Sequence, residues 1–210
     1  MKKLYTLLFA IAVLGNAVFA QNDANAKKIL DAVNAKMKSF KGVTASFTLK
    51  SITKKGKSNG TKAGSVSFKG QKYFLKQEKT EIICDGVKVY NYDGNNNTIT
   101  ISSVADGNQT LSPQNLLSNF YDKDFTYKLV SSAGNYHEIE LIPVDKKKNF
   151  DNVHVFVDKT KNMITKAKIT DKGGNIIDFA LSNLNTSANI PESIFVFNKS
   201  KYPADVDILD

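Results

Sequence analysis

The chain has 210 residues, of which 41% are hydrophobic, so it can form a globular domain with a sizeable core. It has 29 basic residues against 20 acidic ones, and every basic residue is a lysine. Arginine is the side chain that most often contacts bases and phosphates through two parallel hydrogen bonds, so its absence predicts no nucleic-acid partner.

Residues 1–20 have the pattern of a cleaved signal peptide. Two lysines precede an apolar run that is too short to span a bilayer comfortably. Val18 and Ala20 fit the −3 and −1 positions of a signal-peptidase site, so we expect cleavage after Ala20. The processed chain would then have a net charge of +7, because two lysines leave with the leader. No cysteine follows the cleavage point, and this pattern predicts an exported protein without a lipid anchor.

An amphipathic helix is expected directly after the leader. Asn22 or Asp23 can cap its start, and Gly42 lies just beyond its end. Apolar residues recur at three- and four-residue spacing and predict one apolar stripe. The stripe consists of Ala26, Ile29, Leu30, Val33, Met37 and Phe40.

From residue 43 onward the chain is dominated by short alternating segments that predict roughly eleven strands, with "IFVFN" at residues 194–198 as the closing strand. One more helix is expected at residues 111–120, where Ser112 is the cap and Pro113 occupies the first helical position. The pattern predicts a mainly β (α+β) fold and a single domain over residues 21–210.

The stretch "EIICDGVKVYNYDG" predicts a hairpin around Asp85 and Gly86. A two-residue turn there would place Cys84 opposite Val87 and Ile82 opposite Val89. The thiol would then lie among aliphatic side chains, where a structural role is favoured over a reactive one. As the only cysteine of the chain, it cannot form an internal disulfide.

The sequence has no catalytic or metal-binding motif with the required residue spacing. His137 and His154 lie in predicted strands and have no histidine or cysteine at metal-ligand spacing. No G-x-S-x-G motif is present, and the loop at Asp93 lacks the glycine and glutamate of a calcium loop. We therefore expect no enzyme, metal or cofactor, although a pair of carboxylates brought together across strands stays open.

The predicted sheet and helices leave a large set of apolar side chains that must face one another. They form either a filled core or a cavity for hydrocarbon, and composition does not choose between the two. The strand residues of this set are Phe47, Leu49, Val66, Phe68, Phe74, Ile82 and Val89, and the helix residues are Ile29, Val33, Met37, Leu116, Leu117 and Phe120.

Six stretches, in this order and spacing, resemble the LolA family of periplasmic outer-membrane lipoprotein carriers. They are "ASFT" (45–48), "GSVSFKGQKYF" (64–74), "CDGVKVYNYD" (84–93), "LSPQNLL" (111–117), "IELIPVDK" (139–146) and "FVFNKSKYPADVDI" (195–208). The resemblance covers nearly the whole chain after the leader and implies an incomplete antiparallel β-barrel with a helical lid over an apolar cavity.

The resemblance also implies a function and partners. A family member takes acylated lipoproteins from an inner-membrane ABC complex and passes them to an outer-membrane acceptor, without catalysis, and we expect a monomer. The family commonly has an arginine that holds the lid shut, and here Lys69 is the possible substitute. Two alternatives stay open: a LolA-like periplasmic sensor of lipid or lipoprotein, and a small exported hydrolase.

Overall fold

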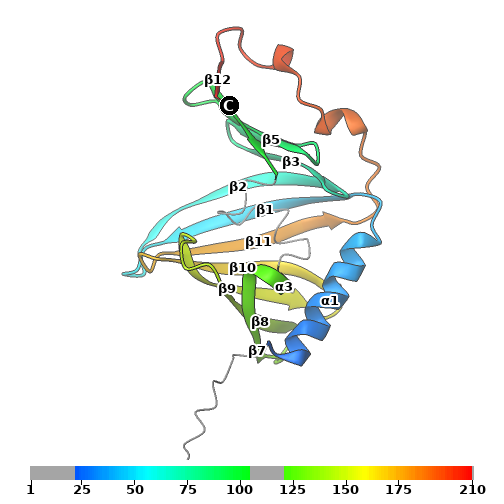
Figure 1. Ribbon diagram of the computed structural model, residues 1–210, viewed down its shortest axis with the longest axis vertical. Helices are drawn as coiled ribbons and strands as arrows, with labels where there is room; N and C mark the ends of the chain where they lie inside the picture. Colours follow the sequence, from blue (N-terminus) through cyan, green and yellow to red (C-terminus); the bar gives the residue numbers. More distant parts are fainter. Residues whose placement is uncertain (1–21, 105–120, 210) are drawn as a thin grey trace, which may run out of the picture.

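The computed structural model describes residues 22–104 and 121–209, which form one large open sheet and a helix. Twelve strands are found in this part of the chain, in the order β12-β6-β5-β4-β3-β2-β1-β11-β10-β9-β8-β7 (Figure 1). All neighbours are antiparallel except β12, which runs parallel to β6. The mainly β fold is confirmed, as an open sheet with two edges.

The bounds of the elements follow the chain. The helices are α1 (Ala24–Lys38) and α3 (Tyr121–Asp124), with 3₁₀ turns η2 (Glu192–Phe195) and η3 (Lys199–Lys201). The strands are β1 (Val43–Ile52), β2 (Ser58–Lys69), β3 (Lys72–Gln77), β4 (Thr80–Cys84), β5 (Lys88–Asp93), β6 (Thr98–Ser103), β7 (Phe125–Ser131), β8 (Tyr136–Pro143), β9 (Phe150–Asp158), β10 (Met163–Asp171), β11 (Ile176–Asn185) and β12 (Asp207–Leu209).

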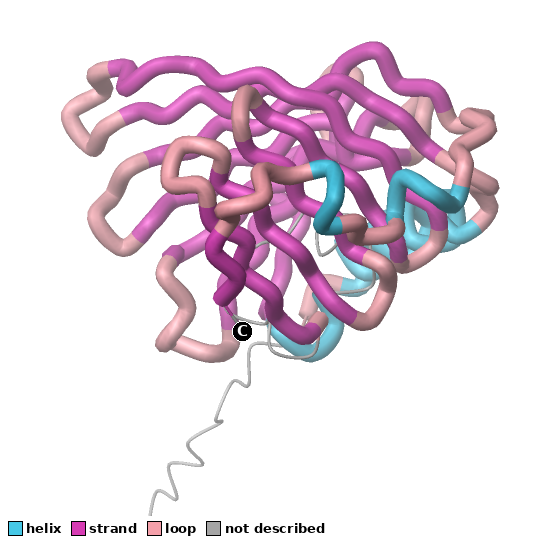
Figure 2. The backbone as a smooth tube through the Cα atoms, turned by 90° about the horizontal axis from the view of Figure 1, so that it is seen from above, coloured by secondary structure: helices cyan, strands magenta, loops and turns pink. Residues whose placement is uncertain are grey.

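The strands form a single curved layer when seen from above (Figure 2). Helix α1 packs against β7 and β10, and we call the sheet face on its side the inner face and the opposite one the outer face. In the middle of the sheet β1 pairs with β11, and this pairing joins the strands that precede residue 104 to the strands that follow residue 124.

Helix α1 has the start and the buried side that the sequence predicts. The Asp23 carboxylate caps it by accepting hydrogen bonds from the N–H groups of Asn25 (2.8 Å) and Ala26 (3.2 Å). The buried side consists of Ala26, Leu30 and Val33. The second expected helix, at residues 111–120, lies outside the described residues.

The edge of the sheet at β7 is covered by the residues that begin α1. The Asn22 side chain accepts a hydrogen bond from Tyr127 N–H (3.0 Å), and the Asp23 carboxylate accepts one from Leu129 N–H (3.1 Å). The Asp23 N–H donates to Tyr127 C=O (3.2 Å). These contacts occupy groups with which another strand would pair, and they fix the start of α1 to the sheet edge.

Strands β1 to β11 lie where alternating segments predict strands, but the expected closing strand at residues 194–198 is wrong. Residues 192–195 form η2 after Pro191, and the residues that follow join no ladder, with Val196 largely exposed. Phe195 is fully buried, and the ring of Phe197 stacks on Tyr90 at 4.5 Å. The twelfth strand is β12, near the end of the chain (Figure 1).

The predicted register of the β4–β5 hairpin is also wrong, by two residues. Cys84 pairs with Val89, and four residues separate the pair. The Asp85 carboxylate accepts hydrogen bonds from the N–H groups of Val87 and Lys88, both at 2.8 Å, which builds a longer turn. Only Gly86 there has positive φ. A shift of two preserves the faces, so Cys84 still points inward.

Candidate functional site

The inner face carries two clusters of apolar side chains that α1 and the sheet bring together. The first lies under α1, where Leu30 and Val33 meet buried side chains of β7 to β10 such as Val155. The second lies on β1 to β4 and is centred on Phe47 and Phe68. Met37 and Phe179 pack against both clusters, so the inner face is apolar from one half of the sheet to the other.

The second cluster depends on a glycine opposite an aromatic ring. Gly64 pairs with Phe47, and a Cβ added at Gly64 would lie 2.5 Å from Phe47 Cζ and even closer to the Lys76 carbonyl oxygen. The Phe47 ring can therefore pass over β2 only because position 64 has no side chain. It stacks against Phe179 of β11 with 6.3 Å between the ring centres.

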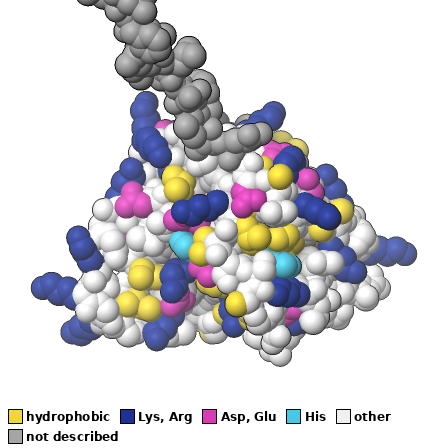
Figure 3. Space-filling model, turned by 90° about the horizontal axis from the view of Figure 1, so that it is seen from below, with side chains coloured by type: hydrophobic (Ala, Val, Ile, Leu, Met, Phe, Trp, Pro, Cys, Tyr) yellow, Lys and Arg dark blue, Asp and Glu magenta, His cyan; other side chains and the backbone are white. Residues whose placement is uncertain are grey.

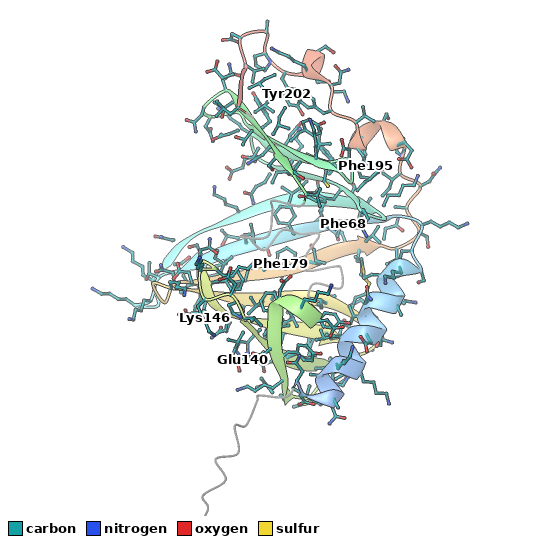
Figure 4. The ribbon with its side chains drawn as sticks, viewed as in Figure 1. Phe68, Glu140, Lys146, Phe179, Phe195 and Tyr202 are labelled. Carbon is teal, nitrogen blue, oxygen red and sulfur yellow. The ribbon has the colours of Figure 1, made fainter. Side chains whose placement is uncertain are left out.

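Most of the predicted site residues are on this face. Ile29, Met37, Leu49, Ile82 and Val89 are partly buried, which leaves part of each side chain accessible, whereas Val33, Phe47, Val66 and Phe68 are buried. Phe68 and Phe179, labelled in Figure 4, come from β2 and β11 on either side of β1. Leu116, Leu117 and Phe120 lie outside the described residues.

Phe74 is the exception among the predicted residues. It pairs with Ser67 on β2 and Ile83 on β4, while its neighbour Leu75 packs against the inner cluster. Residues that pair across antiparallel strands share a face, so Phe74 lies on the outer face with Ile83. In "KYFLKQ" apolar residues occupy both faces of the strand, and the prediction assigned Phe74 to the inner face, which is wrong.

Lys69 contacts the C-terminal segment. Its ammonium lies 2.7 Å from Glu192 Oε1 and donates a hydrogen bond to the carbonyl oxygen of Ile190 (3.3 Å). Lys72 binds the other oxygen of Glu192 at 2.9 Å. Hydrogen bonds from the two lysines lower the pKa of the Glu192 carboxyl to about 2. The lid contact expected of Lys69 stays a prediction, because the lid helix at residues 111–120 lies outside the described residues.

A polar cluster that the sequence did not reveal holds α1 to α3 and β7. The Tyr121 hydroxyl donates to Asp31 Oδ1 (2.7 Å), and Lys27 Nζ reaches both Asp31 (3.1 Å) and Asp122 (3.3 Å). The Tyr127 hydroxyl donates to Asp122 Oδ1 (3.1 Å). We call these five residues the α1 polar cluster. The cluster joins residues of α1 to residues at least 90 positions further along the chain, so no local pattern could have predicted it.

Ionisation within the α1 polar cluster follows its hydrogen bonds. The hydrogen bond from Tyr121 lowers the pKa of the Asp31 carboxyl. Burial, followed by the hydrogen bond to Asp31, raises the pKa of the Tyr121 hydroxyl. The tyrosine therefore stays protonated and the carboxylate ionised over a wide range of pH, which keeps the contact intact.

Within residues 22–104 and 121–209, the histidines and the cysteine do not converge on the inner face. His154 lies 2.8 Å from Glu138 and 3.6 Å from Glu140, on strand positions that alternate with inner-face residues such as Val155. Figure 3 shows the two histidines at the surface, with hydrophobic side chains between them. Cys84 is fully buried, and burial raises the pKa of its thiol, as expected of a structural cysteine.

The described residues contain neither a metal-binding group nor a membrane-spanning helix. No group of three or more His, Cys, Asp or Glu side chains there could hold a metal ion. No helix within the same residues has the length and apolar character needed to cross a bilayer.

Comparison with known proteins gives a consistent family. Residues 38–198 match the family described as "Outer membrane lipoprotein carrier protein LolA". The chain is 31% identical to an outer-membrane lipoprotein carrier protein of Shewanella halifaxensis, over 97% of this chain and 95% of that protein.

Two solved structures share the fold at low sequence identity. An uncharacterized conserved protein from Thermus thermophilus has a TM-score of 0.58 and 13% identity, over 88% of this chain and 98% of its own. A putative outer membrane lipoprotein-sorting protein domain from Vibrio parahaemolyticus has a TM-score of 0.50 and 13% identity, over 83% and 96%.

An open, curved sheet with an apolar inner face under one helix defines a LolA-like fold. The chain belongs to the LolA family of outer-membrane lipoprotein carrier proteins. Proteins of this family are periplasmic lipoprotein carriers without enzymatic activity. Family membership therefore confirms the expectation of a carrier and the expectation that the protein is not an enzyme.

Proposed function

We propose that the inner face binds the acyl chains of lipoproteins and that the protein carries them from the inner to the outer membrane. The observation that supports this most directly is the set of partly buried apolar side chains on the inner face, which includes Met37 of α1, Phe179 and its partner Leu49. Apolar side chains that stay partly accessible on a concave face are suited to an apolar ligand.

The strength of binding must suit release as well as capture. Each methylene removed from water contributes about 0.8 kcal/mol, so complete burial of several long chains would make transfer very slow. A face that covers the chains in part keeps binding reversible. In this proposal the sheet acts as an incomplete barrel, and α1 with the helix expected at residues 111–120 acts as a lid over the acyl chains.

The proposal extends to processing and partners. Removal of the leader after Ala20 would release the protein into the periplasm as a monomer. An inner-membrane ABC complex would load the lipoprotein, and an outer-membrane acceptor would receive it. The covered edge of β7 supports a monomer, because its outward groups are occupied by Asn22 and Asp23.

Native mass spectrometry of protein purified from its own periplasm, without detergent, tests cargo binding. We expect a population whose mass exceeds that of the processed chain by an acylated lipoprotein. Its collapse on delipidation would identify acyl chains as the bound group. A single species at the mass of the empty chain, under conditions that preserve other carrier complexes, would contradict the proposal.

A matched pair of substitutions on β1 tests the face that binds. Leu49→Asn places an amide on the inner face, whereas Thr48→Asn places the same amide on the outer face. An amide that is desolvated without a partner costs about 1–3 kcal/mol, so Leu49→Asn should weaken binding of a fluorescent acyl probe roughly 5- to 150-fold. Thr48→Asn should leave it unchanged, and equal losses in both variants would count against inner-face binding.

A further inference from the structure

Two lysine runs that are far apart in the sequence come together at one end of the sheet. Lys54, in the β1–β2 turn, donates its N–H to Asn175 Oδ1 in the β10–β11 turn (3.3 Å). In the same turn, Lys172 Nζ donates to the carbonyl oxygen of Lys146 in the β8–β9 loop (2.8 Å). Three loops therefore form one surface, on which Figure 4 labels Lys146.

This surface has a clear excess of positive charge. It carries Lys54, Lys55 and Lys57, the lysines at 146–148 and Lys172, which we call the lysine end. Six of these seven lysines are exposed, and Lys148 is half-buried. Asp145, Asp151 and Asp171 are the carboxylates in the same loops and at their borders, so the net charge is +4.

Two of these carboxylates are already engaged locally: Asp145 accepts a hydrogen bond from the backbone N–H of Lys147 (2.8 Å). Asp171 accepts hydrogen bonds from the backbone N–H and the side chain of Asn175, both at 2.8 Å. Asp151 lies 4.0 Å from Lys172, at the limit of an ion pair. No hydrogen bond or ion pair in the described part of the chain involves the ammonium groups of Lys55, Lys57 or Lys147, so these groups remain available to a partner.

Apolar side chains are exposed at the same end. Val144, beside the lysine run of the β8–β9 loop, is 57% exposed. Ile177 is 38% exposed and pairs with Ile169, which packs against the inner-face cluster. The apolar inner face thus becomes accessible next to the lysines.

We propose that the lysine end docks on an anionic phospholipid surface. Lysine ammonium groups are point charges that attract phosphate headgroups without a fixed geometry, and the absence of arginine removes the side chain suited to paired recognition of carboxylates. Exposed valine and isoleucine beside the charges suit shallow contact with a bilayer surface better than contact with an acidic protein face. This inference goes beyond the proposed carrier function and requires no bound cargo.

Vesicle binding tests the proposal with protein purified from the periplasm in its processed, full-length form. Vesicles of phosphatidylcholine with about one third phosphatidylglycerol are compared with vesicles of phosphatidylcholine alone. A variant with Lys55→Gln, Lys57→Gln and Lys147→Gln removes three charges from the lysine end. The control, Lys28→Gln with Lys199→Gln and Lys201→Gln, removes three charges from α1 and η3.

We expect the unmodified protein to bind only the anionic vesicles, with affinity that falls as salt is raised. Each lysine near such a surface contributes about fivefold to partitioning, so the lysine-end variant should bind roughly 100-fold more weakly. The control variant should change binding less than about threefold, since its lysines lie elsewhere.

Equal loss in both variants would assign binding to net charge and overturn the proposal, as would absence of binding by the unmodified protein. Loss of transfer to an acidic partner protein in the lysine-end variant, with vesicle binding intact, would assign the surface to a protein and also overturn it. Acyl-probe binding, measured in parallel, separates failure of this proposal from failure of the carrier function.

Discussion

The Tyr121 hydroxyl joins α3 to α1, and its removal should loosen α1 without disturbing the sheet. Tyr121→Phe keeps the buried ring but deletes the hydrogen bond to Asp31. A hydrogen bond to a charged group contributes about 1.5–3 kcal/mol when shielded. The Asp31 side chain is 50% exposed and also binds Lys27, so water and the lysine replace part of the loss. We therefore expect α1 docking to weaken by about 1 kcal/mol.

Amide hydrogen exchange, resolved by segment, measures this loosening. A change of 1 kcal/mol corresponds to a roughly fivefold increase in the opening of α1, with little change in the central strands. Tyr127→Phe is a matched control, because its hydroxyl binds Asp122 of α3 and not α1. Unchanged exchange in α1, or equal acceleration across the whole sheet, would refute the reasoning.

The effect of Tyr121→Phe should depend on pH in a defined window. The pKa of Asp31 is lowered, so its contribution is present above the ordinary aspartate pKa near 4 and is lost as pH falls through the folded value. The pKa of Tyr121 is raised, so its contribution is complete below about pH 10 and is lost as pH rises through the folded value. Variant and parent should converge in acid.

Three other substitutions test separate parts of the fold. Val33→Glu would place an unpaired carboxylate at a position that is 4% exposed, so we expect a loss of about 3 kcal/mol or more in chemical unfolding, with Val33→Ala as the milder control. Gly64→Ala should cost about 2 kcal/mol in the same assay, because the new methyl meets the Phe47 ring and a carbonyl oxygen; wild-type stability would show that the strand shifts freely. The Glu192 carboxylate contributes stability that is lost as pH falls from the ordinary glutamate pKa near 4.5 through the folded value of about 2, and Glu192→Gln should remove this contribution. An unchanged acid-unfolding curve would mean that the ion pairs with Lys69 and Lys72 contribute nothing to stability.

The sequence predicts the helices and strands of this fold better than it predicts which segments pack against them. Alternation along residues 43–50 correctly identified the inner side of β1, because polar and apolar residues there are cleanly separated. In β3 both sides are apolar, since the C-terminal segment covers the outer face, and Phe74 was therefore assigned to the wrong side. The periodicity of one strand cannot report a covering segment that lies 120 residues away.

The candidate site was predictable in part for the same reason. The apolar residues of α1 and β1 to β5 were named from their spacing, whereas Phe179 and Val155 of the second half of the sheet were missed. Apolar residues stand side by side in both of their strands, so alternation does not identify the inner side there, and nothing local indicates that β11 returns to pair with β1. The α1 polar cluster and the Asp85 turn depend on individual side-chain hydrogen bonds, which leave no periodic signal.

The pairing of β1 with β11 also determines the order in which the molecule can be completed. Leu49 lies opposite Phe179, which follows it by 130 positions, so a chain that emerges N-terminus first has β1 ready long before its partner arrives. A half-sheet of β1 to β6 in that interval would have an unpaired edge along β1 and an uncovered apolar face, which are features that promote aggregation. The seam at the centre of the finished protein is thus the place where a helper that shields nascent exported chains would be most needed.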